Sequence, residues 1–289
     1  MRILVTGKEG QVAQSLGERC TNHELIFAGR PGLDLADAAS IERTVTNVHP
    51  DLIVSAAAYT AVDNAEDEPS VAMAVNGEGP GVLARAGARI GAPIIHLSTD
   101  YIFDGSLDRP YREDDPVAPM GVYGTTKLAG ECAVASSGAQ YAILRTAWVY
   151  SPFGNNFVKT MLRLAGDRDS VNVVDDQRGS PTSALDIADA IVAIADRSRT
   201  DPNWGAYAIY HLAGTGEASW AEFAAAIFAE SEALGGPSAI VTGIPTSAYP
   251  TKAVRPANSR LDCSRLAATF GFHAPDWRVS LREVVARLV

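Results

Sequence analysis

Cysteine is scarce in this sequence. Its 289 residues include three cysteines, Cys20, Cys132 and Cys263, which lie far apart in the chain. An odd number at this spacing predicts neither a disulfide framework nor a zinc site. Long hydrophobic runs are also missing, because the apolar run at residues 2–6 ends at Gly7 and is too short for a signal peptide or a membrane span. We therefore expect a protein of the reducing cytoplasm with no membrane partner.

Basic clusters are missing as well. The chain has 24 Lys and Arg against 34 Asp and Glu, a net charge of −10, and its basic residues are scattered. Proteins that follow a nucleic-acid backbone usually carry basic stripes, so the composition argues against a nucleic-acid partner. A phosphate-bearing small molecule stays compatible with an acidic chain, because a single helix N-terminus can bind a phosphate locally.

The apolar pattern predicts an α/β protein. Short apolar runs alternate with helical segments from residue 1 to 150, which favours a Rossmann-type doubly wound parallel sheet. We expect a cofactor domain at residues 1–150 and a smaller substrate-binding lobe at 151–289, with one or two segments of the lobe returning to the sheet. Expected strands are 2–6, 24–28, 51–58, 93–98 and 141–150; expected helices are 11–20, 40–48 with Ser40 as N-cap, 69–90, one from about Tyr123, 156–166, 183–196 and 219–234.

A glycine turn follows the first expected strand. Gly7, Gly10 and Ala13 have the spacing G-x-x-G-x-x-A and lead directly into a helix. Small residues here permit a tight turn and let the backbone approach a pyrophosphate, while the helix N-terminus offers unpaired N–H groups. The alternative is a strand-to-helix turn without a ligand. Its position in the first βα unit favours a dinucleotide site.

The residues that follow the second expected strand indicate which dinucleotide the chain binds. NAD-binding sites usually place an acid about 20 residues after the glycine turn, to bind the ribose 2′-hydroxyl. Here Arg30 stands in that region, and Asp34 follows slightly later on the adenine side. A guanidinium suits a 2′-phosphate better than a hydroxyl. The sequence therefore favours NADPH over NADH, with use of both left open and a solvated surface charge as the alternative for Arg30.

Tyr123 and Lys127 form a Y-x-x-x-K pair at the start of an expected helix. The spacing places both side chains on one helix face. A nearby ammonium is expected to lower the phenol pKa, and a change from about 10 to about 8 corresponds to about 2.7 kcal/mol. Tyr123 would then donate a proton to a carbonyl. Thr99 or Ser98, at the end of the fourth strand, would hydrogen-bond the same oxygen; ordinary strand-end capping is the alternative.

Longer motifs carry a family resemblance. The chain resembles the extended short-chain dehydrogenases/reductases and, among them, the dTDP-4-dehydrorhamnose reductases. The glycine turn and Y-x-x-x-K are shared across the superfamily, whereas three segments are more specific. These segments are STDYIFDG (98–105), DDQRGSPT (175–182) and RPANSRLD (255–262).

The resemblance implies roles for individual residues. Tyr123 is the implied proton donor, and Lys127 would hold the nicotinamide ribose. Thr99 and Asp100 would contact the substrate, and Trp148 would line the sugar pocket, with a core aromatic as its alternative. The implied cofactor contacts are Gly10, Gln11 and Val12 at the phosphates, Asp34 and Leu35 at the adenine side, and Ala56, Ala57, Ala58 and Tyr59 beside the cofactor.

The C-terminal half supplies candidate substrate contacts. Arg255 and Asn258 lie in the segment KAVRPANSRLD at residues 252–262. A guanidinium can hold a diphosphate through two parallel hydrogen bonds, so we expect Arg255 to contact the diphosphate or sugar, with Asn258 nearby. A solvated loop is the alternative. Some relatives bind magnesium at a dimer interface through an acid in the first helix, where this chain has Ser15. We therefore expect no metal and leave a homodimer open.

The expected function is reduction of dTDP-4-dehydro-6-deoxy-L-mannose to dTDP-L-rhamnose with NAD(P)H. The expected partner is thus a dTDP-linked 4-keto-6-deoxysugar. One alternative is another nucleotide 4-ketosugar reductase or epimerase of the same superfamily. The other is a non-catalytic, NADP-binding regulatory subunit similar to the β subunit of methionine adenosyltransferase. The complete Thr99–Tyr123–Lys127 set favours an enzyme.

Overall fold

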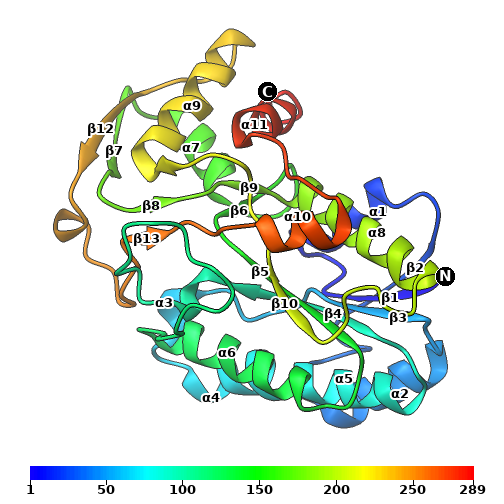
Figure 1. The fold of residues 1–289 in the computed structure, drawn as a ribbon. Helices are drawn as coiled ribbons and strands as arrows, with labels where there is room; N and C mark the ends of the chain where they lie inside the picture. The colour runs from blue at the N-terminus through cyan, green and yellow to red at the C-terminus, as the bar shows by residue number, and fades with distance from the viewer.

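The central feature of the structure, a computed structural model that describes residues 1–289, is one parallel sheet (Figure 1). Its strand order is β2-β1-β3-β4-β5-β10, so the order reverses between β1 and β3. Ligands of doubly wound sheets bind at such a reversal, beyond the carboxyl ends of the strands. The predicted Rossmann-type α/β fold is confirmed. The strands are β1 (Arg2–Thr6), β2 (Glu24–Ala28), β3 (Leu52–Ser55), β4 (Ile94–Thr99), β5 (Tyr141–Thr146) and β10 (Ala208–His211).

Helices cover both faces of this sheet (Figure 1). Alternating side chains of β1 serve the two layers, because Ile3 and Val5 pack on one side and Leu4 on the other. This is why the strand is apolar at successive positions. One face carries α1 (Gln11–Arg19), α8 (Ala184–Thr200) and α10 (Ser264–Phe270), and the other carries α2 (Ala38–Val48), α3 (Val62–Ala65), α4 (Pro69–Ala72), α5 (Gly79–Arg89) and α6 (Val122–Ala135).

Several element boundaries differ from those expected. Asp37, not Ser40, caps α2, because its carboxylate accepts from the Ala39 N–H at 3.0 Å. The expected helix at 69–90 contains a π-helical turn, η1 (Met73–Glu78), between α4 and α5. Pro80 does not break it, since proline is tolerated in the first turn of α5. The expected strand at 51–58 ends at Ser55, and the strand at 141–150 is interrupted before β6 (Val149–Tyr150).

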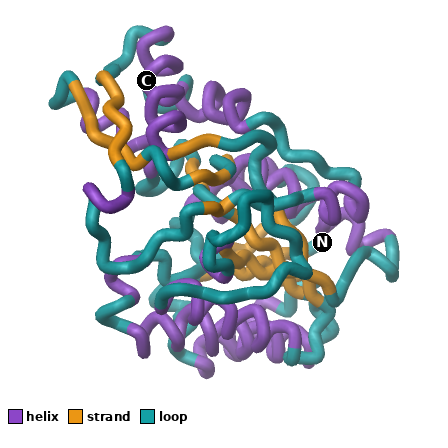
Figure 2. The backbone as a smooth tube through the Cα atoms, turned by 60° about the vertical axis from the view of Figure 1, so that its left-hand side comes forward, coloured by secondary structure: helices purple, strands orange, loops and turns teal.

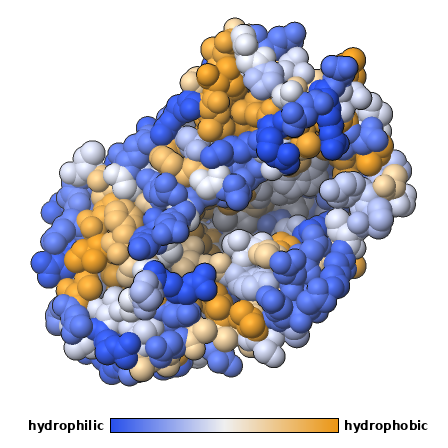
Figure 3. Space-filling view, turned by 180° about the vertical axis from the view of Figure 1, so that it is seen from behind, coloured by the Kyte–Doolittle hydropathy of each residue, from blue (hydrophilic) through white to orange (hydrophobic).

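A second group of elements, here called the small lobe, lies beyond the carboxyl ends of the sheet (Figures 1 and 2). Its own core includes Phe223, Trp277 and Leu281. Seen from behind, the surface is hollowed between the upper and lower parts of the molecule (Figure 3). The small lobe contains α7 (Phe157–Ala165), α9 (Trp220–Ala233), α11 (Trp277–Val285), β7 (Ser170–Val174), β8 (Arg178–Gly179), β9 (Thr182–Ser183), β11 (Ala218–Ser219), β12 (Ile240–Ile244) and β13 (Asn258–Ser259).

The second half of the chain contributes to both layers. β10 pairs with β5 in the main sheet, and α8 packs against α1. The assignment of cofactor binding to residues 1–150 and of substrate binding to residues 151–289 stays a prediction. Two short 3-10 turns, η2 (Asp100–Ile102) and η3 (Thr246–Ala248), complete the structure. None of the helices has the length and apolar character needed to cross a membrane.

Candidate active site

The glycine turn after β1 forms a cradle at the strand-order reversal. Gly7 has a φ of 82°, and a Cβ on it would lie 3.0 Å from the Ala57 Cα. Gly10 is the N-cap of α1 and provides no side-chain cap, so the N–H groups of the first turn face outward unpaired. The Val12 side chain is buried in the core, which leaves its backbone for a ligand. This arrangement fits the pyrophosphate of a dinucleotide.

The segment after β3 is held in place beside this turn. The Thr6 hydroxyl accepts hydrogen bonds from the Ala56 and Ala57 N–H groups, both at 3.1 Å. The buried Asn76 of η1 accepts from the Tyr59 N–H at 2.8 Å and donates to the Tyr59 carbonyl at 3.0 Å. Sequence reasoning missed Thr6 and Asn76. The π-helical turn that carries Asn76 is a feature often found at functional sites.

The residues expected at the adenine end lie after β2. Arg30 is exposed and forms no hydrogen bond or ion pair with the rest of the chain. The Asp34 carboxylate accepts from the Ala36 N–H at 2.9 Å. Leu35 is buried against Gly79, where a Cβ would lie 2.5 Å from the Leu35 carbonyl oxygen. The roles of Arg30, Asp34 and Leu35 toward a cofactor, and that of Ala58 after β3, stay predictions.

Tyr123 and Lys127 lie on successive turns of α6 at the end of β4. Lys127 is buried, and its Nζ donates to the Leu97 carbonyl at 2.6 Å. The Tyr101 ring packs edge-on against Tyr123, with ring centroids 5.5 Å apart. Thr99 lies near the phenol and lowers its pKa, while the Thr99 hydroxyl donates to the Asp100 carboxylate at 3.0 Å. The structure therefore brings together the three residues expected to be catalytic.

Burial shifts both titrating groups of this pair toward their neutral forms. It raises the pKa of Tyr123, and the charge of Asp100 adds to the rise while Thr99 opposes it. Burial lowers the pKa of Lys127 to about 8, against the opposing charge of Glu131. The expectation that Lys127 lowers the phenol pKa is wrong for this structure, because the ammonium is turned to the Leu97 carbonyl. Tyr123 thus stays protonated at neutral pH, as a proton donor must.

A buried ion pair between Glu131 of α6 and Arg145 of β5 holds the end of β4 in place. Glu131, one turn after Lys127, accepts from the Arg145 Nη2 at 2.7 Å and Nε at 2.9 Å. The Ser98 hydroxyl donates to the same carboxylate at 2.5 Å. Because the Ser98 hydroxyl donates to Glu131, Thr99 is the strand-end hydroxyl that remains near Tyr123. An arginine inside the apolar run YAILRT was the signal that a buried acid had to be present.

Asp100 is buried beside Tyr123 with an unused acceptor. Its side chain accepts from the Thr99 hydroxyl at 3.0 Å through Oδ1, whereas Oδ2 has no hydrogen-bond partner. Burial raises the pKa of Asp100 to about 6, although the nearby hydroxyls of Ser259 and Thr99 oppose the rise. A buried oxygen without a partner is costly, and a hydroxyl group of a ligand would satisfy it.

Trp148 adopts a strained backbone conformation beyond β5. Its φ is 49°, which is rare for a bulky residue and is often found at functional sites. The ring stacks on Trp220 with centroids 3.6 Å apart. Gly179 makes room for it, since a Cβ there would lie 2.3 Å from the indole. The sugar-pocket role of Trp148 stays a prediction.

Arg255 connects the small lobe to the main sheet layer. Its guanidinium donates to the Asp63 carboxylate at 2.6 Å and to the Tyr101 hydroxyl at 3.2 Å. It is thus anchored at the edge of the site, one hydrogen bond away from the ring that packs on Tyr123. A neighbouring pair, Lys252 with Asp67, ties the same loop to the segment after α3.

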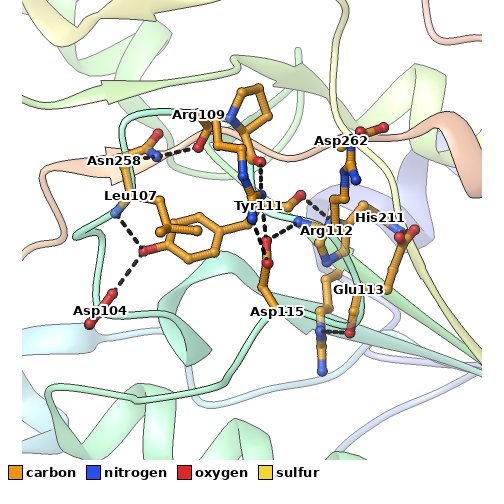
Figure 4. Close-up of polar contacts among 12 residues, drawn as sticks. Asp104, Leu107, Arg109, Tyr111, Arg112, Glu113, Asp115, His211, Asn258 and Asp262 are labelled. Atoms are coloured by element: carbon orange, nitrogen blue, oxygen red, sulfur yellow. Dashed lines mark hydrogen bonds and ion pairs between the residues drawn. The ribbon is translucent and has the colours of Figure 1, made fainter.

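Asn258 is engaged within the protein (Figure 4). Its Nδ2 donates to the carbonyls of Leu107 and Arg109, both at 2.8 Å, and its Oδ1 accepts from Arg260. The loop that it holds also contains Tyr111, whose hydroxyl donates to Asp104 at 2.8 Å. Asn258 therefore positions the loop that leads to Tyr123, and direct contact with a substrate stays a prediction.

The first helix has Ser15 at the position expected for a metal-binding acid, and its one acid, Glu18, is paired with Arg287 at 2.7 Å. Ser15 is buried and its hydroxyl has no hydrogen-bond partner. The structure contains no group of three or more His, Cys, Asp or Glu side chains arranged to hold a metal ion.

Comparisons with known proteins give one consistent result. The family model described as RmlD substrate binding domain matches residues 1–289. A dTDP-4-dehydrorhamnose reductase of Sinorhizobium fredii is 49% identical over 290 residues, which cover 100% of this chain and 98% of that protein. The enzyme of the same name from Escherichia coli K12 is 40% identical, with 100% and 98% covered.

Solved structures agree with the sequence relatives. A dTDP-4-dehydrorhamnose reductase of Clostridium acetobutylicum superposes with a TM-score of 0.92 at 36% identity, covering 100% of this chain and 99% of that one. The Bacillus anthracis enzyme of that name, solved in complex with NADP, has a TM-score of 0.90 at 34% identity, with 99% and 98% covered. The chain therefore belongs to the dTDP-4-dehydrorhamnose reductases, the family of the RmlD substrate binding domain.

Proposed function

We propose that this protein reduces dTDP-4-dehydro-6-deoxy-L-mannose to dTDP-L-rhamnose with NADPH. The family and the NADP-containing relative support the reaction and the cofactor. The observation that carries the proposal is the placement of Tyr123, Thr99 and Lys127 at the carboxyl end of β4, beside an uncapped glycine turn. A ketone reduction needs a proton donor at the place where a dinucleotide can be bound.

Under this proposal the chain would contact the cofactor along its whole length. The first turn of α1 would bind the pyrophosphate, and Ala56 to Tyr59 would line the central part. Arg30 would bind a 2′-phosphate, with Asp34 and Leu35 at the adenine. Lys127, which carries its charge below about pH 8, would hold the nicotinamide ribose. When bound, the cofactor supplies the hydride.

Tyr123 would act as the general acid of the reaction. Its phenol donates the proton that the 4-keto oxygen needs as it becomes a hydroxyl. Thr99 would hydrogen-bond the same oxygen and hold it at the phenol. Asp100 has an unused Oδ2 that would accept from a sugar hydroxyl, which fixes the orientation of the ring.

The remaining substrate contacts would come from Trp148 and from residues after 150. Trp148 would pack on the sugar, and Arg255 would bind the diphosphate after leaving Asp63. Asn258 would contribute mainly by holding the loop that contains Leu107 and Arg109. Under this proposal residues 1–150 bind mainly the cofactor, and residues 151–289 bind mainly the sugar nucleotide.

The test is turnover with a defined substrate. The purified protein is mixed with NADPH and dTDP-4-dehydro-6-deoxy-L-mannose. The loss of NADPH absorbance and the amount of dTDP-L-rhamnose formed are measured over the same time course. We expect one dTDP-L-rhamnose for each NADPH oxidised. Conversion of the sugar without net NADPH oxidation would indicate an epimerase, and NADP binding without any conversion would indicate a regulatory subunit; either result overturns the proposal.

A further inference from the structure

Gln11 links the glycine turn to the small lobe. It is the first residue of α1, yet its side chain points away from that helix to residues 151–156. The Gln11 Oε1 accepts from the Ser151 hydroxyl at 2.9 Å and from the Asn156 Nδ2 at 3.1 Å. Gly154, with a φ of 59°, brings the chain close, since a Cβ there would lie 3.4 Å from the Gln11 Cγ.

These two donors determine how the Gln11 carboxamide is turned. Because Oε1 faces Ser151 and Asn156, the Nε2 group must point elsewhere, and it has no protein partner. The Nε2 atom is also not buried, so a ligand can reach it. Its N–H bonds are therefore free to donate to a phosphate oxygen bound at the N-terminus of α1. One side chain can thus contact both the cofactor and the small lobe.

From Asn156 the contacts continue to the predicted sugar pocket. Asn156 is the N-cap of α7, and its Oδ1 accepts from the Lys159 N–H at 3.2 Å. The next residue, Phe157, packs on Trp220 with ring centroids 4.7 Å apart. Trp220 in turn stacks on Trp148 at 3.6 Å. A continuous set of contacts therefore joins the glycine turn to Trp148.

We infer that Gln11 is a positioning residue that couples cofactor binding to sugar-nucleotide binding, an inference that rests on the function proposed above. A cofactor phosphate that accepts from Nε2 would fix the carboxamide, and the fixed Oε1 would hold Ser151 and Asn156. The start of α7 and the aromatic stack on Trp148 would then be held in the geometry that receives the sugar. By linkage, each ligand must tighten the other by the same factor.

The measurement uses a pair of ligands that cannot react with each other, NADPH and dTDP-L-rhamnose. The dissociation constant of dTDP-L-rhamnose is measured by calorimetry with and without saturating NADPH. For the wild-type protein we expect NADPH to tighten its binding about tenfold, within the usual range of about 5- to 150-fold for coupled sites. For Gln11→Met, which keeps the side-chain length but removes both polar atoms, we expect a factor below about twofold.

Gln14→Met is the matched control. Gln14 lies in the same first turns of α1, and its Nε2 donates to the Glu9 carbonyl at 2.7 Å and forms no hydrogen bond with the small lobe. We expect the coupling factor of this variant to equal that of the wild type, even if its NADPH affinity differs. Thermal unfolding of each variant, followed without ligands, separates loss of coupling from loss of folding.

Ser151→Ala provides a second, independent break. It removes one of the two donors to Oε1, together with the hydrogen bonds of the same hydroxyl to the Phe153 backbone, and leaves the Asn156 cap of α7 in place. We expect it to reduce the coupling factor alone, and to cause no further loss when combined with Gln11→Met, because both act through one contact. If Gln11→Met does not fold, Ser151→Ala carries the test.

Each outcome separates this inference from the proposed function. If dTDP-L-rhamnose fails to bind with or without NADPH, the proposed function is wrong and the inference falls with it. If both ligands bind and the wild type shows no coupling, or Gln11→Met keeps the full factor, or the losses of Gln11→Met and Ser151→Ala add, the inference alone is overturned.

Discussion

At the scale of single residues, the site depends on groups whose polar atoms are only partly used by the protein. Asp100 keeps one carboxylate oxygen without a partner, and the exposed Arg30 forms no hydrogen bond or ion pair. Arg255, in contrast, is held by Asp63 and Tyr101 before any substrate arrives. In the first two residues polar groups are available for a ligand, whereas under the proposed function Arg255 would have to leave Asp63 to bind a diphosphate.

Cofactor choice can be tested at Arg30. Arg30→Asp removes the proposed partner of a 2′-phosphate and adds a repelling carboxylate. We expect the dissociation constant of NADPH to rise at least about tenfold, with NADH affected much less; a hydrogen bond to a charged group contributes about 1.5–3 kcal/mol. Arg168→Asp, an exposed arginine of the small lobe, is the control of equal charge. Equal effects on both cofactors would place Arg30 away from the ribose.

Substrate binding can be tested at Arg255. Arg255→Ala should raise the KM for the sugar nucleotide roughly ten- to a hundredfold, because a charge-assisted hydrogen bond to the diphosphate is lost. The NADPH dissociation constant should stay unchanged. Asp63→Asn removes the carboxylate that Arg255 contacts in this structure and should not raise KM. If both variants raise KM alike, Arg255 acts by holding its loop to α3 and not by binding substrate.

At the scale of elements, the position of α6 decides where Tyr123 and Lys127 lie. α6 packs closely on η1 through Gly130, where a Cβ would lie 2.1 Å from the Asn76 carbonyl oxygen. The same η1 residue holds the backbone of Tyr59 beside the proposed cofactor site. One helix contact therefore aligns Tyr123 and Lys127, the proposed catalytic pair, with the segment that follows β3.

Gly130→Ala tests this contact. The added methyl group must push α6 away from η1, and overpacking of this kind costs about 1–3 kcal/mol. We expect a lower Tm and a loss of kcat that exceeds any change in NADPH affinity. Gly166→Ala, at the C-cap of α7, is the control, since the added carbon would meet no atom closer than 3.4 Å. A Gly130→Ala variant with wild-type Tm and kcat would show that the contact can relax without moving the site.

The local elements could be predicted because their signals are local. Apolar runs, a glycine turn and the Y-x-x-x-K spacing are readable within a few residues, and the sheet and α6 follow from them. The supporting contacts could not be predicted in this way. Gln11 and Asn156 are 145 residues apart, and no periodic pattern links them. The buried pair of Glu131 and Arg145 had a signal, a charge within an apolar strand, but not the identity of its partner.

At the scale of the whole molecule, the burial of two carboxylates, Asp100 and Asp186, makes stability depend on pH. Burial raises the pKa of Asp100 and of Asp186 to about 6. Between about pH 4 and 6 the folded state retains protons that the unfolded chain has released, so the free energy of unfolding falls as pH rises through this range. For the almost fully buried Asp100, ionisation costs the folded state about 3 kcal/mol.

Asp100→Asn tests that cost. The amide cannot ionise, and its Oδ1 can still accept from Thr99. We expect the variant to have a higher Tm than the wild type at pH 7.5, by several degrees, and no such gain at pH 4, where the wild-type carboxyl is protonated. Activity should fall in the same variant, because a carboxylate acceptor for the substrate is lost. A Tm difference that is the same at both pH values would contradict the assigned role of Asp100 in stability.

The central claim is that Tyr123 donates the proton, and Tyr123→Phe tests it most directly. This substitution removes only the phenolic hydroxyl, so the ring still packs on Tyr101. The measurement is kcat for dTDP-4-dehydro-6-deoxy-L-mannose with NADPH, together with the NADPH dissociation constant of the same preparation. We expect kcat to fall by about 10²–10⁴ while the dissociation constant changes little, because general acid catalysis contributes a factor of this size. A Tyr123→Phe enzyme that retains near-wild-type kcat would contradict the account.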